Sequence, residues 1–188
     1  YCLFGSKKHL MNELFENKSY PFYKFGDAIY LQKIGTQDWV EYICNRFSVT
    51  GKQISEQLAE RISQAVDNHS SYVQQLAWLV WIHTDKIATE KDFESAYQDI
   101  IDQNTPLFEK QTESLTTYQM NFLRAVLDGV HSEFTKQEIL NKYQLGTSAN
   151  ISIVKRALEK KELIEIEKRK IIIPDPIMSV WLKRELGM

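Results

Sequence analysis

Apolar residues recur every three or four positions along most of the chain, and this period predicts a mainly α-helical protein. Four such segments follow one another between residues 36 and 104, joined by short links, which predicts a small helical bundle. The third, "HSSYVQQLAWLVWIHT", is apolar on more than one face and is expected to lie at its centre. Thr36 is the expected N-cap of the first helix, and Thr89 the expected start of a capping box before the fourth. The apolar stripes of the other three helices are Trp39, Ile43 and Phe47; Leu58, Ile62 and Val66; and Phe93, Ala96, Tyr97 and Ile100.

A different order of elements follows the polar stretch "NTPLFEKQTES", which contains Pro106 and is interpreted as a joint between domains. Capping boxes beginning at Thr116 and Thr135 predict two helices, of which the second is short. "QLGTS" then predicts a tight turn, "NISIVKRALEKKELI" a third helix, and "ELIEIEKRKIIIPD" two short strands around a charged tip. A last helix is expected in "PIMSVWLKREL". Helix, helix, turn, helix and β-hairpin is the order of a winged helix-turn-helix domain.

The chain opens on a short apolar run, "YCLF", followed by Gly5 and Ser6. The run predicts a buried strand, which needs neighbouring strands. Gly5 and Ser6 at its carboxyl end resemble the ligand-binding edge of an open α/β sheet. A short helix is expected over residues 7–15, and "AIYLQKI" predicts a short strand or an extended tie.

Composition is that of an ordinary globular chain: 43% of the 188 residues are apolar, 26% are charged, and the formal net charge is −2. This balance argues against a protein built mainly to coat nucleic acid or an anionic membrane. Cys2 and Cys44 lie in apolar stretches, so we expect reduced core thiols in a cytoplasmic protein. No apolar run reaches membrane-spanning length, and no membrane contact is predicted.

Motifs of a complete enzyme are missing from the sequence. There is no G-x-x-x-x-G-K-[ST] phosphate loop, and neither cysteine lies in a nucleophile motif. The four histidines are far apart, without metal-ligand spacing. We therefore predict no catalytic residue and no metal ligand in this chain.

Two groups of residues are candidates for binding. The third helix and the tip of the predicted winged domain carry groups that could contact DNA phosphates and base edges. Glutamates are interspersed among them, so a merely solvated face is the alternative. His69 and Ser70 begin the third bundle helix, where free N–H groups suit a phosphate, and a plain N-cap is the alternative. The candidate nucleic-acid contacts are Asn150, Ser152, Lys155, Arg156, Lys168 and Arg169.

An ordered series of motifs runs through nearly the whole chain: "CLFGSKKHLMNELF", "YPFYKFGDAIYLQKI", "WVEYICNRF", "HSSYVQQLAWLVW", "LTTYQMNFLRAVLDG", "LGTSANISIVKRALEKKELI" and "DPIMSVWL". This series resembles the C-terminal half of the archaeal-type AAA+ ATPases, a branch related to the STAND signalling NTPases and to the origin-recognition AAA+ proteins. The resemblance implies that residues 1–35 are the last part of a P-loop ATPase core. It further implies that residues 36–105 are its helical lid and residues 106–188 a winged helix-turn-helix domain.

The same resemblance implies a nucleotide site. Ser6 matches the polar residue that senses the γ-phosphate, and Asn68, His69 and Ser70 match the Gly-x-Pro turn of the lid, although both the Gly and the Pro are missing. An arginine sensor is also absent, because Lys24 and Phe25 stand at the matching place. ATP and Mg²⁺ would bind the intact protein through a phosphate loop and an acidic strand before Tyr1. Neither cofactor is expected in this chain alone.

Three hypotheses follow. The first is the C-terminal lid and winged-helix portion of a prokaryotic AAA+/STAND-like ATPase, in which the ATP state is coupled to DNA or partner binding. The second is a stand-alone winged-helix DNA-binding regulator, and the third is a protein-interaction module with the winged helix as an autoinhibitory clamp. The sequence predicts no oligomeric state.

Overall fold

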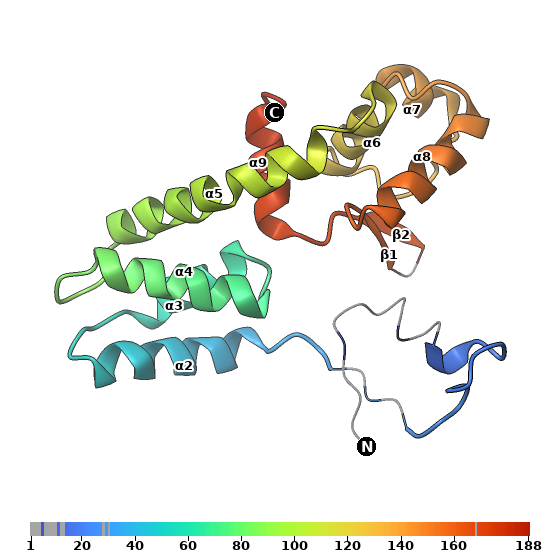
Figure 1. Ribbon diagram of the computed structural model, residues 1–188. Helices are drawn as coiled ribbons and strands as arrows, with labels where there is room; N and C mark the ends of the chain where they lie inside the picture. Colours follow the sequence, from blue (N-terminus) through green and yellow to red (C-terminus); the bar gives the residue numbers. More distant parts are fainter. Residues whose placement is uncertain (1–4, 6–10, 12–13, 28, 30, 168) are drawn as a thin grey trace. The chain divides into compact units, whose positions relative to one another are not determined.

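The computed structural model describes residues 5, 11, 14–27, 29, 31–167 and 169–188 (Figure 1). The chain divides into two compact units, Tyr1–Gln32 and Lys33–Met188. The fold is mainly α-helical, with a helical bundle and a winged helix domain in the larger unit, as predicted. Within the described residues, no helix combines the length and apolarity that a bilayer crossing needs.

The smaller unit lacks regular strands in its described part. The rings of Phe15 and Phe22 have centroids 6.2 Å apart, and Lys24 N donates to Phe15 O at 2.9 Å. Ile29 and residues 31–34, from the segment predicted as a strand or tie, have no regular secondary structure. The predicted strand over residues 1–4 and the candidate residue Ser6 lie outside the described residues.

Four helices form the bundle of the larger unit (Figure 1). The third, α4, packs against the other three, which confirms its predicted central place. Ile62, Val73 and Ile100 are fully buried between them. The helices are α2 (Thr36–Val49), α3 (Glu56–Ala65), α4 (Ser70–His83) and α5 (Glu90–Thr112).

Lys52, in the loop after α2, closes the end of α4. Its Nζ donates to Trp81 O at 2.6 Å and to Thr84 O at 2.5 Å, and it lies 4.1 Å from the centroid of the Trp81 ring. These carbonyls belong to the last turn of α4, where the helix has no further N–H groups to bond them. The half-buried ammonium group therefore satisfies two acceptors and lies at the negative end of the helix dipole.

The segment predicted as a joint between domains, residues 104–114, is mostly helical, because α5 continues through Pro106 to Thr112. Proline removes one backbone donor from the helix interior. Around it, polar side chains bond back to the helix: Asn104 Nδ2 donates to Ile100 O at 2.7 Å, and Thr105 Oγ1 donates to Ile101 O at 3.0 Å. These polar side chains are therefore accommodated in a continuous helix, whose buried face includes Phe108.

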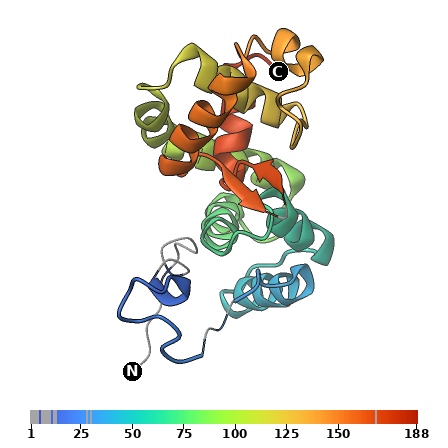
Figure 2. The ribbon, with the colours of Figure 1, turned by 90° about the vertical axis from the view of Figure 1, so that its right-hand side faces the viewer.

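The second half of the larger unit has the predicted winged-helix order (Figure 2). Strands β1 and β2 pair antiparallel, with Ile166 opposite Ile171. His131, between two of the helices, extends this pairing: Ile171 N donates to His131 O, and His131 Nδ1 donates to Ile171 O, both at 2.8 Å. No local sequence pattern predicts this contact of His131. The elements are α6 (Thr117–Leu127), α7 (Gln137–Lys142), α8 (Ser148–Lys160), β1 (Glu165–Glu167), β2 (Lys170–Ile172) and α9 (Pro176–Glu185).

Helix starts were predicted with mixed success. The capping boxes of Thr89 and Thr116 are confirmed, since each hydroxyl accepts from the backbone N–H three residues later. The N-cap of α2 is Gly35 rather than Thr36. The capping box at Thr135 is wrong, because a turn in which Lys136 N donates to Glu133 O takes up this segment before α7 begins.

Candidate functional site

The turn between α3 and α4 has a left-handed backbone without a glycine. Asp67 and Asn68 have φ values of 51° and 52°. Aspartate and asparagine tolerate this region better than other side chains, because their short polar groups can bond locally. The position where the resemblance expects a Gly therefore keeps a conformation that glycine favours.

Two contacts hold this turn against the start of α2. Lys33 Nζ donates to Asp67 O at 3.0 Å and to Asp67 Oδ2 at 2.5 Å. Asn68 Nδ2 donates to Thr36 Oγ1 at 3.1 Å. The Lys33–Asp67 pair is solvent-exposed and contributes little stability.

His69 and Ser70 lie side by side at the start of α4, as predicted, but His69 is the N-cap and Ser70 the first helical residue. The His69 side chain makes no capping hydrogen bond, and its Nδ1 is buried without a partner among the described residues. First-turn N–H groups and the positive end of the helix dipole suit a phosphate or a carboxylate. This end of α4 therefore combines the first-turn N–H groups with a buried ring nitrogen that has no partner among the described residues.

Tyr72, on the same first turn, links α4 to the winged helix domain. Its ring centroid lies 4.8 Å from that of His69, and its hydroxyl donates to Asp175 Oδ2 at 2.7 Å. Burial raises the pKa of Tyr72, and the hydrogen bond to Asp175 and the negative charge of Asp175 raise it further. The hydroxyl therefore remains a donor over the physiological pH range. Sequence reasoning missed this contact, because the partners are 103 positions apart.

The second candidate surface is formed by α8 and the β1–β2 hairpin that follows it. Ser152 and Arg156 are exposed one turn apart on α8, and Lys155 is half-buried. Arg169 is exposed at the hairpin tip. The structure therefore keeps these predicted contacts available on neighbouring elements, whereas Lys168 lies outside the described residues.

Asn150 is engaged within the domain. Its Nδ2 donates to Leu145 O at 3.2 Å, across the turn between α7 and α8. Gly146 in this turn has a φ of 80°, and a Cβ there would lie 3.2 Å from Tyr118 Cε1. The Asn150 amide thus helps to close a tight turn, which uses one of the two N–H donors of its Nδ2.

Ile153 is an additional residue of the α8 surface that sequence reasoning missed. It is 68% exposed and lies outside the buried stripe of Ile151, Val154 and Leu158. Its position outside the apolar stripe of the helix was the sequence signal that could have indicated an exposed side chain. An exposed aliphatic side chain on this helix suits a thymine methyl group or an apolar patch on a protein.

Among the described residues, no group of three or more histidine, cysteine, aspartate and glutamate side chains could hold a metal ion.

The comparisons with known proteins agree with this architecture. A family described as a probable winged helix domain matches residues 106–184. Among solved structures, the Walker-type ATPase of Pyrococcus abyssi has a TM-score of 0.71 at 16% sequence identity, and the similarity covers 95% of this chain and 51% of that one. At this identity the similarity shows a shared fold. The comparison with curated proteins gave no match. This chain thus contains a winged helix domain and spans about half the length of the ATPase that it resembles.

Proposed function

We propose that this chain is the lid and winged-helix portion of a prokaryotic AAA+/STAND-like ATPase, which couples the ATP state to the binding of DNA or a protein partner. The observation that carries the proposal is the fold similarity to a Walker-type ATPase along 95% of this chain but only 51% of the other. In this proposal, residues 1–35 complete the ATPase core, residues 36–105 are the lid, and residues 106–188 are the winged helix domain.

The start of α4 fits a role in nucleotide binding. The first-turn N–H groups near Ser70 could hold a phosphate or ribose oxygen, together with the buried Nδ1 of His69, which has no partner among the described residues. Ser6 would contact the γ-phosphate. ATP supplies the hydrolysable phosphoanhydride, and the residues that hold Mg²⁺ would precede Tyr1. The residues of this chain would position the nucleotide and sense it.

Exposed apolar side chains in the smaller unit support its assignment to a larger core. Ile29 and Leu31 are 84% and 88% exposed, and Phe25 is also well exposed. Aliphatic side chains at alternate positions of an extended segment usually pack against neighbouring strands or helices. The remainder of an ATPase core would supply such a surface.

The nucleotide proposal is tested on the longer protein that includes the segment before Tyr1. The double substitution His69→Ala, Ser70→Ala is expected to weaken ATP binding by about ten-fold, because it removes a ring nitrogen and a hydroxyl next to the phosphate. Isothermal titration calorimetry measures the affinity, and Ser71→Ala is the matched control because it is exposed on the same turn.

Two further results would refute the nucleotide proposal. One is robust ATP turnover by residues 1–188 alone, which contain no phosphate loop. The other is the absence of a phosphate loop from the sequence that precedes Tyr1.

Duplex DNA is the partner that the exposed side chains of Ser152, Arg156 and Arg169 favour. The double substitution Lys155→Ala, Arg156→Ala is expected to weaken DNA binding about ten-fold. It should also reduce the slope of the logarithm of the binding constant against the logarithm of the salt concentration by about two. Fluorescence anisotropy at several salt concentrations measures both quantities. Lys86→Ala, Lys91→Ala removes the same charge from the bundle and should leave binding unchanged.

Absence of DNA binding at low salt would contradict the DNA assignment. Capture of a defined protein partner through α8 would then favour the protein-interaction hypothesis.

A further inference from the structure

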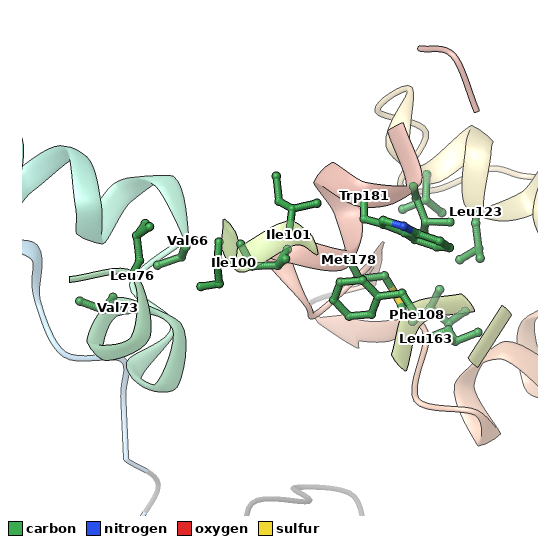
Figure 3. Close-up of a cluster of buried hydrophobic side chains, with 14 of the residues drawn as sticks. Val66, Val73, Leu76, Ile100, Ile101, Phe108, Leu123, Leu163, Met178 and Trp181 are labelled. Atoms are coloured by element: carbon green, nitrogen blue, oxygen red, sulfur yellow. The ribbon is translucent and has the colours of Figure 1, made fainter. Parts of the chain in front are cut away.

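Helix α5 belongs to two parts of the molecule at once. Near its middle, Ile100 is fully buried with the bundle residues Val66 and Leu76 (Figure 3). Two turns later, fully buried Phe108 lies among winged-helix residues, with its ring centroid 5.6 Å from that of Trp181. The helix between them is unbroken, so the two cores form one continuous apolar cluster.

Helix α9 returns from the hairpin to pack along α5 and also contacts α6. Its buried residues include Ile177, and also Met178 and Trp181, which are labelled in Figure 3. The last helix of the winged helix domain is therefore packed on the helix that is shared with the bundle.

Polar contacts secure both ends of α9. At its start, Asp175 caps the helix through Oδ1, which accepts from Met178 N at 2.9 Å, while Oδ2 accepts from Tyr72 of α4 at 2.7 Å. At its end, Arg184 Nη1 donates to Asp102 Oδ1 at 3.1 Å, and Nη2 donates to Thr105 Oγ1 at 3.4 Å. Each end of α9 is thus bonded to a helix of the bundle.

We propose that α9 is a strap, fastened by Tyr72–Asp175 and Arg184–Asp102, which makes the bundle and the winged helix domain move as one rigid body. A two-domain ATPase segment could instead flex at the predicted joint near Pro106. The unbroken α5, the shared core and the two polar fastenings all oppose such flexing. Any coupling of the ATP state to the winged helix domain through this rigid body rests on the proposed function. The rigid connection itself does not.

The strap is tested in residues 1–188 without nucleotide. Spin labels are placed at exposed Ser48 of α2 and Lys160 of α8, with Cys2 and Cys44 replaced by alanine. Double electron–electron resonance then measures the distance distribution between the bundle and the winged helix domain. We expect a single narrow distribution in the parent, and a broader one or a second population after Tyr72→Phe, Arg184→Met.

The double substitution Tyr143→Phe, Arg61→Met is the matched control. It removes the same chemical groups, but from contacts that do not join the bundle to the winged helix domain. Tyr143 donates to Asp128 inside the winged helix domain, and Arg61 pairs with Glu90 and Glu94 inside the bundle. This control should keep the narrow distribution. A broad distance distribution in the parent would overturn the proposal, whatever the variants show. The proposal would also be overturned if the distribution of Tyr72→Phe, Arg184→Met stayed as narrow as that of the control. Failure of the longer protein to bind ATP would refute the proposed function without changing this result.

Discussion

Replacing Phe108 by alanine is expected to lower the free energy of unfolding of the larger unit by about 3–5 kcal/mol. The Phe108 side chain is fully buried and packs against Trp181, so its removal leaves a cavity that the surrounding rings fill only in part. Because α5 is shared by the bundle and the winged helix domain, we expect both to unfold together at lower urea. Urea denaturation, monitored by both circular dichroism and tryptophan fluorescence, measures the free energy of unfolding and shows whether the two transitions coincide.

The adjacent Leu107 provides the control for Phe108→Ala. Leu107 is 51% exposed, and Leu107→Ala is expected to change the free energy of unfolding by less than about 1 kcal/mol. Equal losses from the two variants would contradict the packing described for α5.

Replacing Lys52 by methionine is expected to lower the free energy of unfolding by about 1.5–3 kcal/mol. Methionine keeps the length of the side chain but cannot donate to Trp81 O or Thr84 O, so two acceptors at the end of α4 lose a charged partner. The cation beside the Trp81 ring is lost as well. Chemical denaturation measures the difference.

Lys91→Met is the matched control for this substitution. Lys91 is exposed on the first turn of α5, and the change is expected to alter the free energy of unfolding by less than about 0.5 kcal/mol. If Lys52→Met is as mild as the control, the capping role assigned to Lys52 is wrong.

Local periodicity was sufficient to predict most helices and the winged-helix order. The stripe of Trp39, Ile43 and Phe47 is buried in α2, and that of Leu58 and Ile62 is buried in α3. Burial of one face imposes a spacing of three to four residues, and this spacing is visible without any knowledge of the partner surface. The turn before α8 was also predicted from a local signal, in this case Gly146, whose φ of 80° suits glycine.

Contacts between distant positions could not be predicted in this way. The Tyr72–Asp175 bond joins residues that no local pattern connects, and His131 pairs with Ile171 across 40 positions. The continuation of α5 through Pro106 was not predicted, because Asn104 and Thr105 can bond either to water in a loop or to carbonyls in a helix. Tertiary burial of Phe108 decides between these two outcomes.

For the candidate sites, the sequence predicted which residues begin a helix but not the local hydrogen bonds that they make. His69 and Ser70 were placed correctly at a helix start, because the onset of an apolar segment marks one. Which of the two is the cap depends on the left-handed turn at Asp67 and Asn68, which the sequence pattern did not reveal. The internal bond of Asn150 likewise depends on the exact path of the turn before α8.

The uninterrupted length of α5 amplifies small rotations. With 23 residues and a rise of about 1.5 Å per residue, the helix is about 35 Å long. For a rigid body, a tilt of about 10° at the start of α5 would carry its other end through about 6 Å, slightly more than one helical turn. In the proposed ATPase, a change of ATP state that tilts α5 by such an angle would move the winged helix domain at its far end by a distance of the same order.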